Sequence, residues 1–310
     1  MTIYNLRFGK LGALGRAERN AGEAYRFANT VGLPRSGKPS GGGVCGGAAR
    51  GGESTTGNTV IMTGGEVSTL CGGKSDKSAT GNVVIVAGDS KVGMDVLGGN
   101  ATGGSSRDNK VYLVGNGATA TIADAQGEKA EYTGGKLSLR HVIAGGEGDT
   151  MSGNSVDIYG TGIDAGDLRM MQVLNFHIAN LDDGATPMIT LPSWLYLTNF
   201  LVPTEDNPSP ELALTFDALD SMEWKPGASV TLVNAGSGIK IDESLLGKEY
   251  NIYRNGDPDK TVLGTATLKL EQGEGTTKIL KLVTNGNVPE PTTGILSLLA
   301  LAALTARRRK

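Results

Sequence analysis

The residues with the most specific chemistry lie at the end of the chain. Residues 288–310 begin with a stiff turn, Pro289-Glu290-Pro291, continue with the uncharged run 294–306, and end in Arg307, Arg308, Arg309 and Lys310. As a helix rising about 1.5 Å per residue, this run reaches roughly 20 Å, less than the ~30 Å hydrocarbon core of a bilayer. Adjacent cations hold such a segment on the cytoplasmic side of a membrane. The tail therefore predicts a short membrane helix, with the rest of the chain on the far side.

The apolar part of the predicted helix consists of Gly294, Ile295, Leu296, Leu298, Leu299, Leu301 and Leu304. The Pro-Glu-Pro triplet before it and the cations after it closely resemble the PEP-CTERM sorting signal of Gram-negative bacteria. The resemblance implies that exosortase, a membrane-embedded transpeptidase, recognises the triplet and removes the helix. It also implies export: a precursor held transiently in the inner membrane, then a protein at the cell surface or outside the cell. The alternative is an ordinary anchor that stays in place.

Other patterns for catalysis, cofactors or metals are not found in the sequence. The two histidines, His141 and His177, lack metal-ligand spacing. A polysaccharide lyase would collect acids and bases on one strand face, and the residues that could supply them are Asp95, Arg107, Arg140, Asp157, Asp164, Asp167 and Arg169. They share no position in the repeat of the chain, so solvated surface charge explains them better. We expect no enzyme, cofactor or metal site, with a solenoid carbohydrate-active enzyme as the alternative.

Composition narrows the class of protein further. The chain has 310 residues, 48 of them Gly, only 5% aromatic residues, and a formal charge of −3. Without the four tail cations the body is more acidic still, which argues against nucleic acid as a partner. Residues 1–40 are basic, lack the apolar core of an export signal, and are expected to be poorly ordered. An export tail without an export signal indicates a start site assigned too late, or a truncated, non-functional copy of a longer surface protein.

A repeat in the sequence predicts the strands of the chain. An Asn precedes each of four short strand-like runs, at Asn58, Asn82, Asn109 and Asn154, and an apolar residue follows two and four positions later. Apolar residues at period two, beside positions that drift, predict strands with one buried face. A Gly pair follows in each unit, beginning at Gly46, Gly72, Gly98 and Gly145. The long third interval predicts an insertion between about residues 115 and 132.

Short strands at a repeat of about 26 residues, with Gly at the corners, predict an all-β fold: a parallel β-solenoid over residues 41–180. The pattern resembles the passenger domains of autotransporters, although no room remains for a translocator barrel. We expect residues 181–287 to form a β-rich cap around Trp194 and Trp224, with 285–287 as a linker to the tail at 288–310. The resemblance implies an adhesive or structural protein, whose partners would be extracellular polysaccharide or other surface proteins.

Two cysteines provide a check on the repeat length. Cys45 and Cys71 lie 26 residues apart, and each directly precedes a Gly pair. They are therefore expected to stack on neighbouring coils, about 4.8 Å apart, a separation that permits a disulfide. Side chains in register on parallel strands point the same way, which strains that bond. A buried pair of free thiols is thus the slightly favoured alternative.

Overall fold

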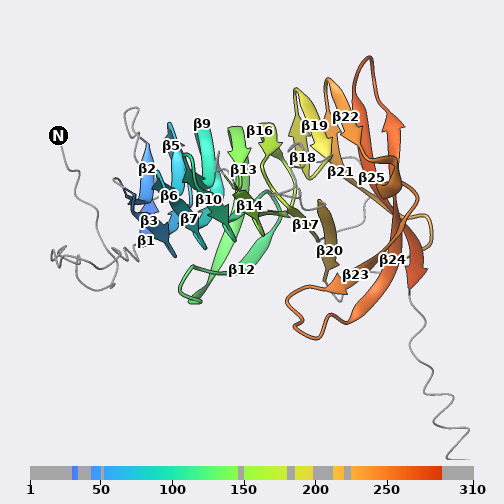
Figure 1. Ribbon diagram of the computed structural model, residues 1–310. Helices are drawn as coiled ribbons and strands as arrows, with labels where there is room; N and C mark the ends of the chain where they lie inside the picture. Colours follow the sequence, from blue (N-terminus) through green and yellow to red (C-terminus); the bar gives the residue numbers. More distant parts are fainter. Residues whose placement is uncertain are drawn as a thin grey trace, which may run out of the picture.

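The computed structural model describes residues 30–33, 43–49, 52–145, 150–179, 186–197, 212–219 and 225–287. Within them the protein is all-β, with one large, mostly parallel sheet and a single 3-10 turn, η1 (Glu243–Leu245). Figure 1 shows the strands following one another along one direction, from β1 at the blue end to β25 at the red end. None of the described helices is long and apolar enough to cross a membrane. The predicted C-terminal helix lies outside the described residues.

The longest ladder of strands, stack 1, runs the length of the molecule. Its members pair in parallel in the order β1 (Thr30–Leu33), β4 (Thr59–Met62), β8 (Val83–Val86), β11 (Lys110–Val114), β15 (Ser155–Tyr159), β17 (Val173–Ile178), β20 (Ala213–Ala218) and β23 (Glu249–Arg254). Strand β1 belongs to the segment predicted to be poorly ordered, and it pairs with β4 along its whole length.

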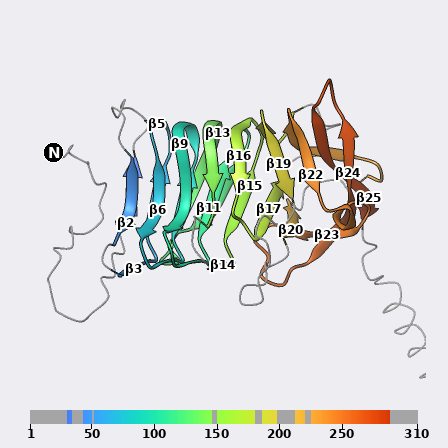
Figure 2. The ribbon, with the colours of Figure 1, turned by 45° about the horizontal axis from the view of Figure 1, so that its top comes forward.

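Two further ladders share three long strands. Stack 2 comprises β5 (Gly65–Val67), the first half of β9 (Gly88–Ala101), the middle of β13 (Lys129–Ile143), the first half of β16 (Ile163–Arg169), then β18 (Ile189–Leu191) and β21 (Ser229–Ala235). Stack 3 comprises β2 (Val44–Ala48), β6 (Leu70–Ser75) and the second halves of β9, β13 and β16. Figure 2 shows the strands of stack 3 side by side.

A fourth, short ladder completes each round of the chain. Stack 4 contains β3 (Ser54–Thr56), β7 (Ser78–Thr80), β10 (Ser105–Arg107) and β14 (Thr150–Ser152), all parallel. A separate parallel pair joins β19 (Trp194–Leu197) to β22 (Gly238–Ile241). From β4 to β14 the chain visits stacks 1, 2, 3 and 4 in turn and then starts again.

The register of stack 1 agrees with the apolar periodicity of the sequence. Val84 pairs with Val60 on one side and with Val111 on the other, and Val111 pairs with Val156. All four are fully buried in one core that continues to Leu282, near the C-terminal end of the body. Lys110, which precedes Val111, is exposed. The apolar positions at period two are therefore the inward face of the strands.

The repeated Asn residues form a buried hydrogen-bonded ladder. Asn58 donates its backbone N–H and its side-chain Nδ2 to Asn82 Oδ1, at 3.1 and 2.8 Å. Asn82 donates in the same way to Asn109, Asn109 to Asn154, and Asn154 to Gln172 Oε1. Asn58 Oδ1, at the upstream end, has no partner within the described residues. Each amide thus satisfies backbone and side-chain groups that the corner would otherwise bury unpaired.

The Gly pairs of β2, β6 and β9 lie inside strands, whereas the sequence predicted Gly at the corners. Gly72 and Gly73 lie inside β6, and neither is among the residues of positive φ. A Cβ on Gly72 would lie 2.3 Å from the carbonyl oxygen of Gly98, and one on Gly73 would lie 2.7 Å from the Asn82 side chain. The pair is therefore required for close approach of neighbouring strands and of the Asn ladder. The positive φ falls instead on the residue before each Asn, as at Gly81 (φ 63°).

The predicted insertion folds as a hairpin over stack 1. β12 (Thr119–Ala123) pairs antiparallel with the first part of β13. Ile122 and Tyr132 of this hairpin pack in a second apolar cluster against Ile85 and Val83, on the outer side of β8. The hairpin tip reaches β4, where the Ala125 N–H donates to Thr59 Oγ1 at 2.9 Å. The outer face of stack 1 is thereby covered at β4, β8 and β11.

Parallel pairing continues beyond residue 180 and ends only at β23. There β24 (Val262–Gln272) pairs antiparallel with β23, and β25 (Lys278–Asn287) pairs antiparallel with both β24 and β21. The predicted linker at 285–287 is instead part of β25, where Gly286 pairs with Thr265 and Asn287 with Gly264. Trp224 and the side chain of Trp194, expected in the cap core, lie outside the described residues.

Candidate functional site

Three ionisable side chains converge on the outer face of stack 1. Asp157 of β15, His177 of β17 and Asp217 of β20 project from neighbouring strands, away from the core. His177 Nδ1 lies 2.7 Å from Asp217 Oδ1, and His177 Nε2 lies 3.2 Å from Asp157 Oδ1. The side chains remain only 10–21% exposed. We call these three residues the His177 cluster.

The residues around the cluster complete its hydrogen bonding. Asp157 also accepts from Ser155 Oγ at 2.9 Å and from Asn175 Nδ2 at 2.7 Å. The Tyr159 ring stacks on the imidazole, with centroids 3.7 Å apart and planes 2° from parallel. Strand alternation places these polar groups outward, and their neighbours on the two adjacent strands bury them.

Electrostatics keep the imidazole of His177 charged. Burial lowers its pKa, but the hydrogen bonds and charges of Asp157 and Asp217 outweigh burial and raise the pKa to about 9. Burial, together with the Asp157 charge, raises the pKa of the Tyr112 and Tyr159 phenols. At neutral pH the cluster therefore holds an imidazolium between two carboxylates, beside neutral phenols.

This arrangement limits what the His177 cluster can do chemically. Both ring nitrogens already face carboxylate oxygens, so the imidazolium has no lone pair to accept a proton from a substrate. The Asp157 carboxylate is occupied by three donors. Such a saturated group ties β15, β17 and β20 together, and it differs from the exposed acid–base pair that a polysaccharide lyase needs.

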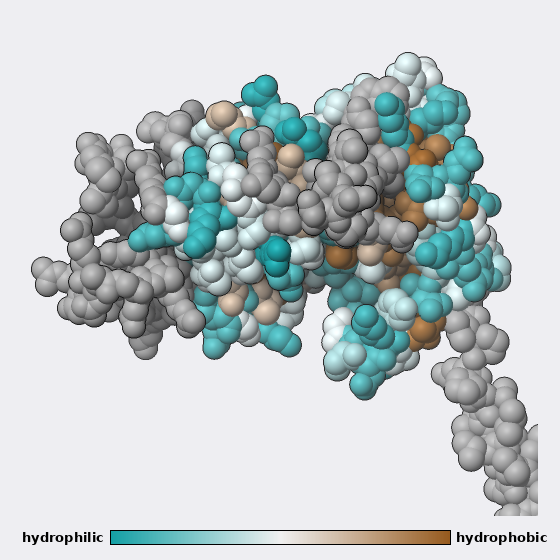
Figure 3. Space-filling model, viewed as in Figure 1, coloured by the Kyte–Doolittle hydropathy of each residue, from teal (hydrophilic) through white to brown (hydrophobic). Residues whose placement is uncertain are grey.

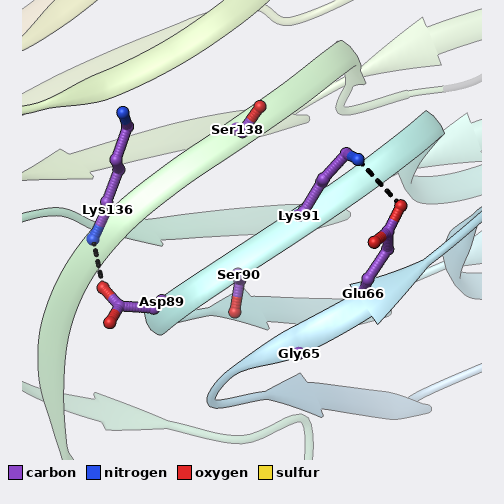
Figure 4. A pocket seen from close by; sticks show the side chains of 7 residues that line it. All are labelled: Gly65, Glu66, Asp89, Ser90, Lys91, Lys136 and Ser138. Carbon is purple, nitrogen blue, oxygen red and sulfur yellow. Dashed lines mark hydrogen bonds and ion pairs between the residues drawn. The ribbon is translucent and has the colours of Figure 1, made fainter. Parts of the chain in front are cut away.

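A polar depression of about 580 Å³ lies across stack 2. Figure 4 shows Glu66 on β5, Ser90 and Lys91 on β9, and Lys136 and Ser138 on β13 around it. Lys91 Nζ pairs with Glu66 at 2.9 Å, with both side chains more than half exposed. Such an exposed ion pair contributes little to stability. The depression presents both signs of charge and the Ser138 hydroxyl to solvent, whereas the Ser90 hydroxyl is buried and donates to the Ala87 carbonyl; no aromatic residue lines it.

The seven charged residues named from the sequence do not form one site. Asp95 and Asp167 share a register position through His141 of β13, and His141 Nδ1 lies 3.0 Å from Asp167. Sequence reasoning did not find this shared register, because a histidine occupies the intervening strand. Arg169 contacts Asp167 at 3.2 Å. The remaining ones stand on different strands: Arg107 on β10, Arg140 on β13, Asp157 on β15 and Asp164 earlier on β16.

Cys45 and Cys71 are register partners on β2 and β6, the arrangement that their 26-residue spacing predicts. Both are free thiols, Cys45 exposed and Cys71 buried. Cys71 packs with Leu97 and Ile143 on the same side of stack 3. Among the described residues, no group of His, Cys, Asp or Glu is suited to hold a metal ion.

The residues named for sorting lie outside the described part of the chain. They are the triplet at 289–291, the apolar residues between 294 and 304, and the cations at 307–310. The described chain leads directly to them, because β25 ends at Asn287. Sequence reasoning missed the role of His177 and Asp217, because both lie in strands without the Asn and Gly landmarks. In the sequence, His177 lies 20 residues from Asp157 and 40 residues from Asp217.

Comparison with known families identifies the tail. Residues 287–310 match the PEP-CTERM protein-sorting motif. No curated protein and no solved structure matches the chain. The motif implies an exported precursor, anchored to the membrane of a Gram-negative bacterium, and its processing by exosortase, a membrane enzyme. The chain thus carries an all-β body, followed without a spacer by a sorting signal.

Proposed function

We propose that this protein is a structural or adhesive component of the bacterial exterior, a parallel β-solenoid released or attached after exosortase removes its tail. The observation that carries the proposal is the sorting motif placed directly after a repetitive β body. The order in which the chain visits stacks 1 to 4 supports the solenoid, because one round alone cannot bury its apolar face. The resemblance to autotransporter passengers is part of the same proposal.

The contact surface of this protein is its long polar flank. Figure 3 shows hydrophilic residues over much of the visible face, with hydrophobic residues gathered toward the C-terminal strands. The depression at Glu66, Lys91 and Lys136 offers charges and a hydroxyl to a polar polymer. Extracellular polysaccharide is the preferred partner, and other surface proteins are the alternative. Retention of the purified body on polysaccharide from the host, weakened by Lys91→Glu with Lys136→Glu, would support this partner.

Processing is tested in the native host by replacing Pro289-Glu290-Pro291 with alanines. The mature wild-type protein should lack residues 294–310, whereas the variant should remain an uncleaved membrane-bound precursor. Thr292→Ala with Thr293→Ala, directly beside the triplet, is the matched control and should be processed normally. Intact-mass analysis that finds Lys310 in the mature wild-type protein would contradict the proposal and favour a permanent anchor.

A carbohydrate-active enzyme is the second candidate function. The convergence of Asp157, His177 and Asp217 on one outer face is the observation in its favour. Saturation of both imidazole nitrogens weighs against it. The test is turnover: incubate the protein with polysaccharides of the host and measure new chain ends, comparing wild type with His177→Gln. Activity that His177→Gln abolishes without unfolding the protein would replace the structural role with a catalytic one.

A further inference from the structure

The two thiols occupy the first two rungs described in stack 3. Cys45 of β2 and Cys71 of β6 lie side by side in register. Neighbouring strands lie about 4.8 Å apart, inside the ~4.4–6.8 Å range of Cα separations in disulfides. Cys71 is 4% exposed, whereas Cys45 is open to solvent. An oxidant can therefore reach the Cys45 thiol from solvent, and the buried Cys71 thiol lies on the neighbouring strand.

The surroundings make Cys45 the more nucleophilic thiol. The hydrogen bond with Cys71 lowers the pKa of Cys45 to about 7; backbone contacts and the Lys74 charge also lower it, and burial opposes them. The same hydrogen bond, together with burial, raises the pKa of Cys71. The lowered pKa favours the thiolate of Cys45, which is the reactive form.

We propose that Cys45 and Cys71 form a disulfide after export, which fastens the first described round of the chain to the second. This step rests on the exported location of the proposed function, because disulfides persist in oxidising compartments. The oxidant is a disulfide, either a small molecule such as oxidised glutathione or an oxidoreductase. No other part of the proposed function depends on this bond.

The reaction balances as two thiol–disulfide exchanges. The Cys45 thiolate attacks one sulfur of the oxidant, forms a mixed disulfide, and expels the other sulfur as a thiolate. Cys71 then loses its proton and attacks the Cys45 sulfur, which releases the second half of the oxidant. Both cysteines are oxidised, the oxidant disulfide is reduced to two thiols, and those thiols take up the two protons.

The position of each cysteine in stack 3 determines which side chain can turn to form the disulfide. Side chains in register leave parallel strands in the same direction, so bond formation requires one cysteine to turn toward the other. Cys71 is held between Cys45 and Leu97 of β9. β2 pairs with β6 alone among the described strands, so a shift of Cys45 disturbs the hydrogen bonds of one described pairing, whereas a shift of Cys71 disturbs those of two. The movement therefore falls on β2.

The test uses the purified full-length protein, incubated with oxidised glutathione under native conditions. Intact mass should fall by two hydrogen atoms, and a non-reducing digest should contain one peptide that links Cys45 to Cys71. The thermal midpoint of the oxidised form should exceed that of the reduced form by several degrees, because the bond restricts the unfolded chain. The rise should disappear on reduction.

Two variants distinguish the alternatives. Cys71→Ser should stop at a mixed disulfide between Cys45 and glutathione, and Cys45→Ser should react far more slowly at the buried Cys71. A wild-type protein that accumulates only the mixed disulfide, or a dimer linked through Cys45, would overturn the proposal. The oxidation is carried out in vitro, so its failure leaves processing untouched. Conversely, retention of Lys310 in the host would contradict sorting without affecting the linked peptide.

Discussion

The two ends of the body solve the same packing problem by different means. Between Asn58 and Asn154, the residues of the main apolar core are Val, Leu, Met and Ala without an aromatic ring, and an amide ladder satisfies the buried polar groups of each corner. Toward the C-terminus the ladder stops at Gln172, and aromatic rings take over: Phe176 stacks on Phe216, whose ring meets Tyr250 edge-on. A further identical round extends the sheet but cannot end it, because its edge strand still exposes unpaired backbone N–H and C=O groups. The antiparallel β23–β24–β25 meander supplies that end.

The largest effect should come from placing a charge in the repetitive core. Val111→Asp buries an unpaired carboxylate at a fully buried position, and we expect it to unfold the repetitive region. Lys110→Glu, one residue earlier and exposed, should retain native circular dichroism and thermal midpoint. Equal sensitivity at the two positions would mean that the inward and outward faces of β11 are wrongly assigned.

A methyl group at a Gly pair should have the next largest effect. In Gly72→Ala the added carbon would lie 2.3 Å from the Gly98 carbonyl oxygen, so the neighbouring strands must separate. We expect a loss of about 3 kcal/mol or more in urea unfolding, as for overpacked cores. Gly93→Ala is the control, because its added carbon would lie 3.8 Å from the nearest atom, the Val67 carbonyl oxygen. Similar losses in both would assign the cost to backbone freedom instead of contact.

Breaking the amide ladder should test the corner chemistry directly. Asn109→Ala removes the acceptor of the Asn82 N–H and Nδ2 groups and the donor to Asn154 Oδ1. Leaving these groups buried and unpaired should cost about 2–3 kcal/mol in urea unfolding. Asn100→Ala is the matched control, since Asn100 Oδ1 is buried without a partner. A neutral Asn109→Ala would show that water replaces the ladder.

The His177 cluster should make stability depend on pH in the alkaline range. The folded pKa of His177, about 9, exceeds the ordinary value of about 6.5, so the charged imidazole stabilises the folded state. That contribution is fully present below pH 6.5 and is lost as pH rises through 9, amounting to about 3 kcal/mol. His177→Gln should flatten the profile of unfolding free energy against pH between these values. If the pH dependence of stability is the same in His177→Gln as in the wild type, the cluster does not hold a stabilising imidazolium.

The smallest expected effect concerns the upstream limit of the repeat. Thr30 pairs with Thr59, and in the sequence Asn29 precedes Thr30 as Asn58 precedes Thr59. Asn58 Oδ1 has no partner among the described residues, and the spacing predicts that the ladder extends to Asn29. We expect Asn29→Ala to cost about 1 kcal/mol, coupled to Asn58→Ala in a double-mutant cycle. Losses of unfolding free energy that simply add, or an Asn29→Ala loss no larger than that of the control Asn20→Ala, would show that the ladder ends at Asn58.

How far the sequence predicted the molecule depends on which residues repeat. The Val60, Val84, Val111 and Val156 register and the position of the hairpin insertion followed from spacing alone, because each round must stack on the last. The position of the Gly pairs inside β2, β6 and β9 did not follow, since close approach and the positive φ of a corner favour the same residue. The His177 cluster was also hidden, because its members come from rounds of unequal length, and strand pairing alone brings them together.

The junction at Asn287 has a mechanical consequence. β25 is bonded to β24 along its whole length and to β21 over residues 278–283, and the sorting signal continues from its end. A pull on the tail would therefore load β25 along its length, and hydrogen bonds on both sides would have to shear together instead of opening one at a time. A body tethered by such a strand would resist drag until the whole end of the sheet gives way.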